Sequence, residues 1–340
     1  MATGAEEHQV REKGTKSGSD SRGVGVAVVG FGNAGRQHVA AVEATDGARP
    51  AAVVETGAEA ARQARAAGLP VRPLPEVLAD PAIDVVALCL PPGHRPSVLA
   101  AVLGARKHVM VEKLPARSPA ELRAMLEAAA RAGVLSTVMF QHRFALPADL
   151  RAKAPDRFAD ATGSLLVSRP RSDEHYLRGW RSEPETAVGG VSVHLGAHYL
   201  DLACQLLGEP AEVTPLARTD AAAGIDTQLS GHVRFSSGAH LTVAVTCRAS
   251  ARVEQLTVLG RHDWVEVSAG VTVGEVDGRP LRAPARPAAD LRTDVYRELV
   301  DALRGGPAPD LAVLDRSAGV VAVLDGLLGT PIGTTSRVAP

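Results

Sequence analysis

The sequence has few cysteines, few aromatic residues and no long apolar run. Its three cysteines, Cys89, Cys204 and Cys247, are scattered and form no CxxC pair, which argues against a disulfide framework and favours a reducing compartment. No apolar run reaches the roughly 18 to 20 residues that a membrane-spanning helix needs. Residues 1–22 have no apolar core of the kind found in a secretory signal. We therefore predict a cytoplasmic protein that has no membrane partner.

The chain also has no excess of charge of one sign. Its 37 basic and 38 acidic residues give a formal net charge of −1, and both kinds are mixed along the chain, which argues against a nucleic-acid partner. The length of 340 residues allows two ordinary domains. Residues 1–22 are charged and rich in glycine and serine, and we predict a disordered tail there.

Residues 23–143 alternate between short apolar runs and helical patterns. The strand-like runs are 24–29, 51–54, a short one near Val71, 85–90, 108–111 and 134–140. The helical patterns cover 36–44, 58–67, 97–104 and 119–132. Strands that alternate with helices are typical of right-handed βαβ crossovers and of a parallel sheet covered on both faces. We therefore predict a doubly wound, Rossmann-type α/β domain over residues 23–143.

The pattern changes beyond residue 143. Strand-like stretches follow in series at 164–168, 228–235, 240–247, 254–259 and 264–268, and turn residues separate them. Such a series without intervening helices indicates a mostly antiparallel sheet with one open face. Helical patterns lie apart from it at 192–207, 293–304 and 317–328. We predict a second α/β domain over residues 144–340.

A glycine-rich motif leaves the first strand and opens the first helix: Gly30, Phe31, Gly32, Asn33, Ala34 and Gly35. In this position, backbone N–H groups and the helix N-terminus face the pyrophosphate of a dinucleotide. The first glycine permits a tight turn, the second lets the phosphates approach, and the third lets helix and strand pack closely. The motif therefore predicts a dinucleotide site, whereas a lone motif of this type would be weak support.

Glu55 ends the second strand, twenty residues past Gly35. An acid at this place accepts hydrogen bonds from the ribose hydroxyls. It would also repel a 2′-phosphate, and no arginine or lysine follows until Arg62. The sequence therefore favours NAD over NADP.

Two further groups lie at the carboxyl ends of predicted strands, where doubly wound sheets bind ligands. Pro91 follows the strand at 85–90, and Glu112-Lys113 follows the strand at 108–111. A lysine there can hold a substrate hydroxyl, or it can act as an acid or base if burial and the nicotinamide cation lower its pKa. The alternative is a surface ion pair.

The stretch 189–201 carries the second polar group. If it is helical, His194, His198 and Asp201 share one face, at positions i, i+4 and i+7. Asp201 would then orient the imidazole of His198 for proton transfer. A His-x3-His pair can also bind zinc, but no HExxH glutamate or third ligand accompanies it, so we predict no metal site. Polar residues on a half-buried helix are the third interpretation.

Taken together, these landmarks resemble the glucose-fructose oxidoreductase, inositol dehydrogenase and rhizopine-catabolism (Gfo/Idh/MocA) family. The resemblance covers nearly the whole chain after residue 22, through GFGNAG at 30–35, PPGHR at 91–95, KHVMVEKLPARS at 107–118, FQHRF at 140–144, YLRGWR at 176–181, GGVSVHLGAHYLDL at 189–202 and FSSGAHLTV at 235–243. The resemblance implies a Rossmann domain followed by an α/β domain for substrate binding and for assembly, as a homodimer or homotetramer, through its open sheet.

The resemblance also implies roles for single residues. Lys113 matches the lysine of the family's Glu-Lys-Pro motif, and His198 matches the usual acid/base. With the helix spacing above, we predict substrate contacts at Lys113, Tyr176, Trp180, Arg181, His194, His198 and Asp201, with Arg178 and Arg143 as weaker ones. His194 is also predicted to be catalytic, as a proton relay. Two departures are visible: Leu114 precedes Pro115, and His194 stands where polyol dehydrogenases of the family commonly carry aspartate.

The sequence thus predicts an NAD-dependent oxidoreductase that moves a hydride between nicotinamide and a hydroxyl or keto carbon of a small sugar, amino sugar or cyclitol. Two alternatives stay open. One is an enzyme that retains NAD and uses transient oxidation for glycoside hydrolysis or epimerisation, with no net redox change. The other is a sensor or scaffold that binds a sugar or dinucleotide without catalysis.

Overall fold

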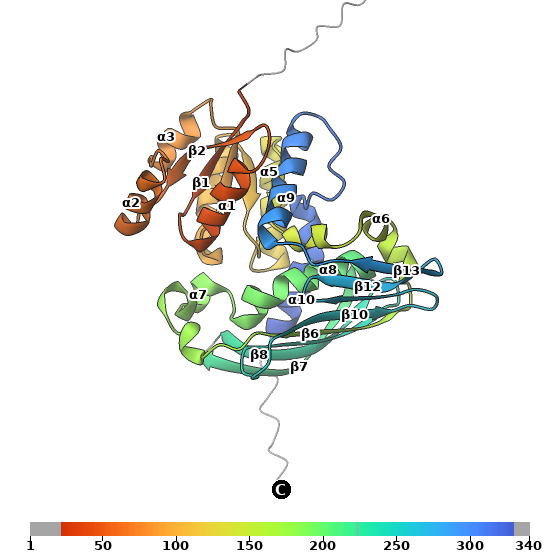
Figure 1. Ribbon diagram of the computed structural model, residues 1–340. Coiled ribbons are helices and arrows are strands. Elements are labelled where there is room, and N and C mark those ends of the chain that lie inside the picture. Colours follow the sequence, from red (N-terminus) through yellow and green to blue (C-terminus); the bar gives the residue numbers. More distant parts are fainter. Residues whose placement is uncertain (1–21, 223, 330–340) are drawn as a thin grey trace, which may run out of the picture.

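The computed structural model describes residues 22–222 and 224–329, and they form two α/β domains (Figure 1). The predicted tail over 1–22 lies outside the described residues, apart from Arg22. Figure 1 shows the first domain above a large curved sheet, with α8 and α10 between that sheet and the first domain.

The first domain is built on a parallel sheet whose strand order is β2-β1-β3-β4-β5. Its strands are β1 (Val24–Val29), β2 (Ala48–Val54), β3 (Val85–Leu88), β4 (His108–Val111) and β5 (Ser136–Val138). Its helices are α1 (Asn33–Glu43), α2 (Ala58–Ala66), α3 (Leu74–Ala79), α4 (Arg95–Gly104) and α5 (Pro119–Ala132). The strands are short apolar runs because helices cover both faces. The predicted doubly wound fold is confirmed, and its strand order reverses between β1 and β3, where such folds bind ligands.

Two local predictions in this domain are wrong. The strand expected near Val71 is a single bridge to Val53, and the short helix α3 follows it. Helix α3 has six residues, which is too short for a periodic pattern to identify. The first helix was expected from residue 36, but α1 begins at Asn33, inside the glycine motif.

The second domain contains an eight-stranded sheet in the order β13-β12-β11-β10-β6-β9-β8-β7. Its strands are β6 (Thr162–Ser168), β7 (Pro210–Ala222), β8 (Ile225–Phe235), β9 (His240–Thr246), β10 (Val253–Leu259), β11 (Trp264–Ser268), β12 (Val271–Val276) and β13 (Arg279–Ala283). Among the described strands of this sheet, only β6 and β9 pair in parallel, so the prediction of a mostly antiparallel sheet is confirmed. The sequence did not indicate β7, because this edge strand contains two prolines and is interrupted by bulges.

The remaining helices are α6 (Ala148–Arg157), α7 (Pro184–Ala187), α8 (Ala197–Leu207), α9 (Ala288–Leu303) and α10 (Ala318–Leu328). Short helical turns are η1 (Pro92–His94), η2 (Gln141–Ala145), η3 (Asp173–His175), η4 (Gly179–Ser182) and η6 (Leu314–Ser317). The stretch 192–207, expected as one α-helix, is a π-helix, η5 (Ser192–Gly196), that continues into α8. Across residues 22–222 and 224–329, no helix has both the length and the apolarity to cross a membrane.

Helix α9 returns from the second half of the chain to the first domain, where it packs on α1. Tyr296 and Leu299 of α9 join Val39 of α1 in a buried cluster with Val26 and Val28 of β1. The first domain is therefore completed by a segment that follows the large sheet in the sequence.

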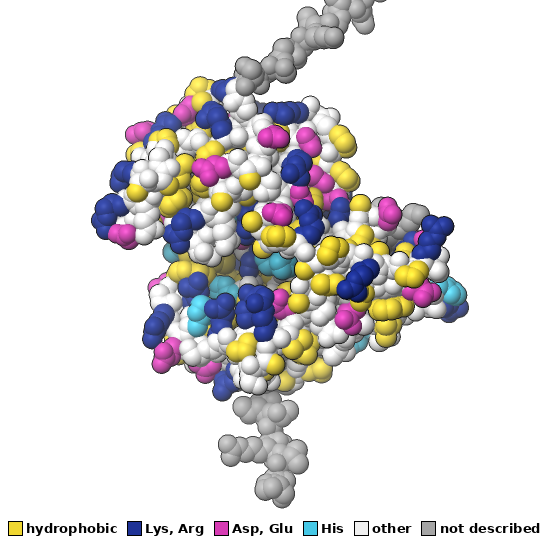
Figure 2. Space-filling view, viewed as in Figure 1, with side chains coloured by type: hydrophobic (Ala, Val, Ile, Leu, Met, Phe, Trp, Pro, Cys, Tyr) yellow, Lys and Arg dark blue, Asp and Glu magenta, His cyan; other side chains and the backbone are white. Residues whose placement is uncertain are grey.

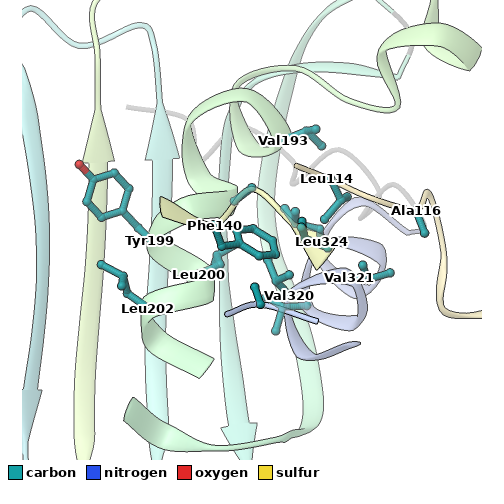
Figure 3. Close-up of a cluster of buried hydrophobic side chains, with 14 of the residues drawn as sticks. Leu114, Ala116, Phe140, Val193, Tyr199, Leu200, Leu202, Val320, Val321 and Leu324 are labelled. Carbon is teal, nitrogen blue, oxygen red and sulfur yellow. The ribbon is translucent and has the colours of Figure 1, made fainter. Parts of the chain in front are cut away.

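A second apolar cluster lies beneath the junction of the domains (Figure 3). Figure 3 shows Phe140 beside Leu200 of α8 and Val320 of α10, with Leu114 near Leu324. Each of these side chains is at most 2% exposed, and burial of one such side chain stabilises the fold by roughly 1.5 to 3 kcal/mol. The cluster fixes the segment after β4 relative to α8 and α10.

Candidate active site

The glycine motif has the backbone geometry that a dinucleotide requires. Gly30 has φ +90°, and a Cβ there would lie 2.9 Å from the carbonyl oxygen of Cys89. A Cβ on Gly35 would lie 2.0 Å from the carbonyl oxygen of Gly30, so only glycine lets α1 approach β1 this closely. A Cβ on Gly32 would meet no described atom within 4 Å. Phe31 is buried, whereas Gly32 and Asn33 are exposed to solvent. Among the described residues, no side chain forms a capping hydrogen bond at the N-terminus of α1. These features fit a pyrophosphate at the helix N-terminus.

The carboxylate of Glu55 lies beside this loop. Its two oxygens accept hydrogen bonds from the backbone N–H groups of Phe31 and Gly57, each at 2.7 Å. Arg62, the first basic residue after Glu55, is paired with Glu59. The acid thus lies directly beside the glycine loop, and the first basic residue that follows it in the sequence already has an acidic partner.

Lys113 follows β4 at the carboxyl edge of the sheet, and its backbone is held by the buried Arg95 of α4. Arg95 donates to the carbonyl oxygens of Glu112 at 2.7 Å, Leu114 at 2.5 Å and Lys113 at 3.3 Å. The Lys113–Leu114 peptide bond is cis. Arg95 also donates to the carbonyl oxygen of Leu90, just before Pro91, so it ties the ends of β3 and β4 together.

Glu112 belongs to a buried hydrogen-bonded chain. One oxygen lies 3.0 Å from Nε2 of His38, whose Nδ1 lies 2.6 Å from the hydroxyl of Tyr296. The other oxygen accepts from the backbone N–H of Lys113 at 3.1 Å. Burial opposes ionisation of Glu112, but the bond to His38 and its positive neighbours hold its pKa at about 2. The chain links α1, β4 and α9 directly behind Lys113.

The side chain of Lys113 crosses to the second domain. Its Nζ donates to the carbonyl oxygen of His194 at 2.7 Å and lies 3.5 Å from that of Val193. Burial lowers its pKa to about 8, and the charge of Arg95 adds to this, while Glu112 opposes it. The ammonium group therefore lies between the end of β4 and the π-helix η5.

His198 lies in the first turn of α8, and its ring stacks on that of His142, with centroids 4.3 Å apart. Burial holds the pKa of His198 well below its usual range, and the positive charge of Lys113 contributes to this. Burial likewise lowers the pKa of His142 to about 4. Nδ1 of His198 is buried and has no hydrogen-bond partner among the described residues. His198 is therefore neutral near pH 7 and has an unused polar atom.

The predicted role of Asp201 is wrong. Both of its carboxylate oxygens bind the guanidinium of Arg143, at 2.5 and 2.8 Å, and both side chains are 1% exposed. Asp201 therefore neither orients His198 nor faces the site. A buried carboxylate without a counter-ion strongly destabilises a fold, so Asp201 pairs with the buried guanidinium. The two residues are 58 positions apart, so local spacing does not predict this pair.

His194 faces a different set of neighbours. The ring of Trp180 contacts it edge-on at 5.3 Å, and that of Tyr176 lies at 6.0 Å. The guanidinium of Arg181 lies 4.6 Å from the centre of the Trp180 ring. Nε2 of His194 is buried and has no described hydrogen-bond partner. Four of the predicted substrate residues are thus brought together on one side of Lys113.

The spacing of residues along the sequence does not identify His142 or His38 as part of the site. His142 lies in the FQHRF motif, but its spacing to His198 indicates nothing, because the two rings meet only when η2 packs on α8. His38 follows the glycine motif, and its partners Glu112 and Tyr296 lie 74 and 258 residues away. Over the part of the chain that the structure describes, no group of three or more histidine, cysteine or acidic side chains could hold a metal ion.

Comparison with known proteins gives two family models in the expected order. Residues 24–140 match an oxidoreductase family with an NAD-binding Rossmann fold. Residues 120–266 match the GFO/IDH/MocA C-terminal domain. Together the two models cover residues 24–266, which include Lys113, His194 and His198.

Individual proteins give the same picture. D-glucoside 3-dehydrogenase of Escherichia coli K12 is 33% identical over 38% of this chain and 37% of its own length. D-xylose 1-dehydrogenase (NADP(+)) 2 of Haloferax volcanii is 28% identical over 64% of each chain. The chain thus matches less than two thirds of these relatives. The WlbA dehydrogenase of Bordetella pertussis, solved with NADH and UDP-GlcNAcA, has a TM-score of 0.75 at 26% identity, over 90% of this chain and 95% of its own.

Proposed function

Because the chain belongs to the GFO/IDH/MocA family of oxidoreductases, we propose that it transfers a hydride between NAD and a hydroxyl or keto carbon of a sugar, amino sugar or cyclitol. The observation that carries this proposal is the contact between Lys113 and η5, the π-helix that continues into α8. The lysine from the dinucleotide domain reaches the backbone of His194, four residues before His198. A substrate held there would lie at the carboxyl edge of the sheet, where nicotinamide is presented.

The residues divide the work of such a reaction. NAD, when bound, supplies the hydride chemistry. In the oxidation direction, the neutral imidazole of His198 takes the proton of the substrate hydroxyl. The Nζ of Lys113 donates to the same oxygen and stabilises the negative charge that develops on it. Glu112 and Arg95 hold the backbone of Lys113 in place. The second domain supplies η5, which binds the side chain of the lysine.

We propose NAD rather than NADP as the cofactor, although two relatives are named for NADP(+). Replacing Glu55 with serine and Thr56 with arginine removes an acid and adds a phosphate ligand. We expect the ratio of the NADPH to the NADH dissociation constant to fall by about 100-fold, or roughly 2.7 kcal/mol. Fluorescence titration of the two cofactors measures this, and Glu43→Ser, an exposed acid at the far end of α1, is the matched control. An unchanged ratio would contradict the assignment of Glu55.

The direct test of the function begins with the cofactor. The purified protein is denatured, and the extract is analysed by mass spectrometry for NAD, NADP and their reduced forms. Binding of NADH followed by turnover of a sugar or cyclitol, with a change in absorbance at the nicotinamide band, supports the proposal. Product formed without net NADH favours an epimerase or hydrolase that retains NAD. Failure of both dinucleotides to bind would overturn the proposal.

The lowered pKa of Lys113 predicts the pH profile. The lysine is charged below about pH 8 and neutral above it, so kcat/KM should fall about tenfold per pH unit above that value. The pKa of His198 lies well below its usual range, so no rise is expected between pH 7 and 8. In Lys113→Arg the cation persists, and the fall near pH 8 should disappear. A fall near pH 8 that survives in this variant would assign it to another group.

We further propose that the chain assembles as a homodimer or homotetramer through the large sheet. The face opposite α8 and α10 is open in Figure 1 and carries the exposed side chains of Leu166, Leu259 and Trp264. Exposed apolar groups on an open sheet are typical of an interface. Light scattering on the purified protein measures the assembly, and a monomer at all concentrations would rule it out. We also propose a cytoplasmic location, because Cys89, Cys204 and Cys247 are all free thiols.

A further inference from the structure

The side of the site around His194 is positively charged. Arg181 and Lys113 both lower the pKa of His194, after the larger effect of burial. Arg171 and Arg181 likewise lower the pKa of His175, again after burial. Figure 2 shows lysine and arginine side chains beside histidines on the second domain, facing the first domain. These cations therefore surround the place where a substrate would extend away from Lys113.

Two of these arginines have no acidic partner. Among the described residues, no carboxylate forms an ion pair with Arg171 or Arg181, and the guanidinium of Arg181 instead lies over Trp180. The neighbouring arginines are paired: Arg169 with Glu254, Arg178 with Glu174, and Arg248 with Asp173 at 3.5 Å. Two unpaired guanidinium groups beside a site are available to a ligand, and their planar donors match carboxylate and phosphate oxygens.

A buried hydroxyl group lies in the same region. Tyr176 is 1% exposed, and its hydroxyl has no hydrogen-bond partner among the described residues. Burial raises its pKa, whereas Arg171 and Arg181 act in the opposite direction, so the hydroxyl lies within reach of their charges. A buried polar group without a partner is costly, and an anionic oxygen would accept its hydrogen bond.

A hollow of about 530 Å³ adjoins this region and is lined by residues 170–173 and 247–249. Arg171 and Arg248 lie on it, as does Asp173, which is already paired with Arg248. The lining therefore contains two cations and one anion, which leaves an excess of one positive charge. The volume exceeds that of a carboxylate or a phosphate group, so such a group has room beside the arginines.

We propose that the substrate carries an anionic group, a carboxylate or a phosphate, which binds Arg171 and Arg181 while its reacting carbon faces Lys113 and His198. This inference rests on the hydride transfer proposed above and narrows its substrate to acidic sugars or sugar phosphates. The imidazole at position 194 is neutral and can donate a hydrogen bond, so it does not repel such a ligand. An anion here would also offset the positive charge that the nicotinamide ring adds.

The test compares matched ligands on the protein saturated with NADH, at constant ionic strength, by isothermal titration calorimetry. The probes are D-glucuronate, glucose 6-phosphate, inorganic phosphate and uncharged D-glucose. We expect at least one anion to bind about tenfold or more tightly than glucose, and the two sugar anions distinguish carboxylate from phosphate. Arg181→Gln should weaken that anion by about 10- to 100-fold and leave glucose unchanged, as expected for loss of a charged hydrogen bond.

Three controls keep the test decisive. Arg234→Gln removes an exposed arginine of the second domain that is paired with Glu212, and it should change nothing. Arg181→Lys should retain part of the affinity, and Arg171→Gln should resemble Arg181→Gln. The proposal is overturned if glucose binds as tightly as the anions, if no anion binds at tens of millimolar, or if Arg181→Gln weakens glucose equally. If NADH fails to bind, the proposed function falls, but an anion affinity that Arg181→Gln abolishes still supports the anion site.

Discussion

Replacing His198 with alanine should lower kcat by roughly two to four orders of magnitude, the usual contribution of a positioned general acid or base. The geometry favours this histidine over its neighbours. Its ring lies in the first turn of α8, four residues beyond the carbonyl group that Lys113 binds. Its pKa lies well below the usual range, so the imidazole is free to accept a proton at neutral pH.

The stacked partner of His198 provides the matched control for this experiment. His142→Phe keeps an aromatic ring against His198 but cannot carry a proton, so its loss of turnover should stay below tenfold. His240→Ala, on the outer face of β9, should leave turnover unchanged. NADH binding, measured by fluorescence, should be the same in all three variants. A loss below tenfold in His198→Ala, or a larger one in His142→Phe, would transfer the role to the other imidazole.

Local sequence patterns predicted most of the fold and also marked the glycine loop and Glu55 as a candidate cofactor site. Gly30, Gly32, Gly35 and Glu55 lie within 26 consecutive residues, and strand, turn and helix each show a signal at that scale. The same holds for the order of strands and helices in the first domain. The edge strand β7 was missed because its prolines and exposed side chains do not alternate as a half-buried strand does.

The substrate side depends on contacts that no local pattern contains. The expected shared face of His194 and His198 assumed 3.6 residues per turn, but the π-helix η5 inserts a wider turn between them. His194 therefore faces Trp180 and Tyr176, whereas His198 faces His142. The sequence placed both histidines on one helix, and only the packing of distant segments shows that their rings have different neighbours.

The misassigned Asp201 leads to the second large effect, which is on stability. Arg143 belongs to η2 and Asp201 to α8, and the guanidinium also donates to the carbonyl oxygen of Arg316 in η6 at 3.0 Å. The pair therefore joins three elements beneath the site. Asp201→Ala leaves a buried guanidinium without its counter-ion, and such a change costs about 3 to 5 kcal/mol of unfolding free energy. Urea denaturation measures this loss.

A charge-free pair separates the structural role from a catalytic one. In the double variant Arg143→Met/Asp201→Leu both buried charges are removed together, so the unfolding free energy should recover most of what Asp201→Ala loses. If Asp201 acts only through packing, the folded double variant keeps the pH profile of the parent enzyme, because His198 and Lys113 retain their surroundings. If Asp201 instead orients His198, stability returns while turnover stays low. Recovery of stability together with the parent pH profile would show that the pair has a structural role, which is to hold α8 against η2 and η6.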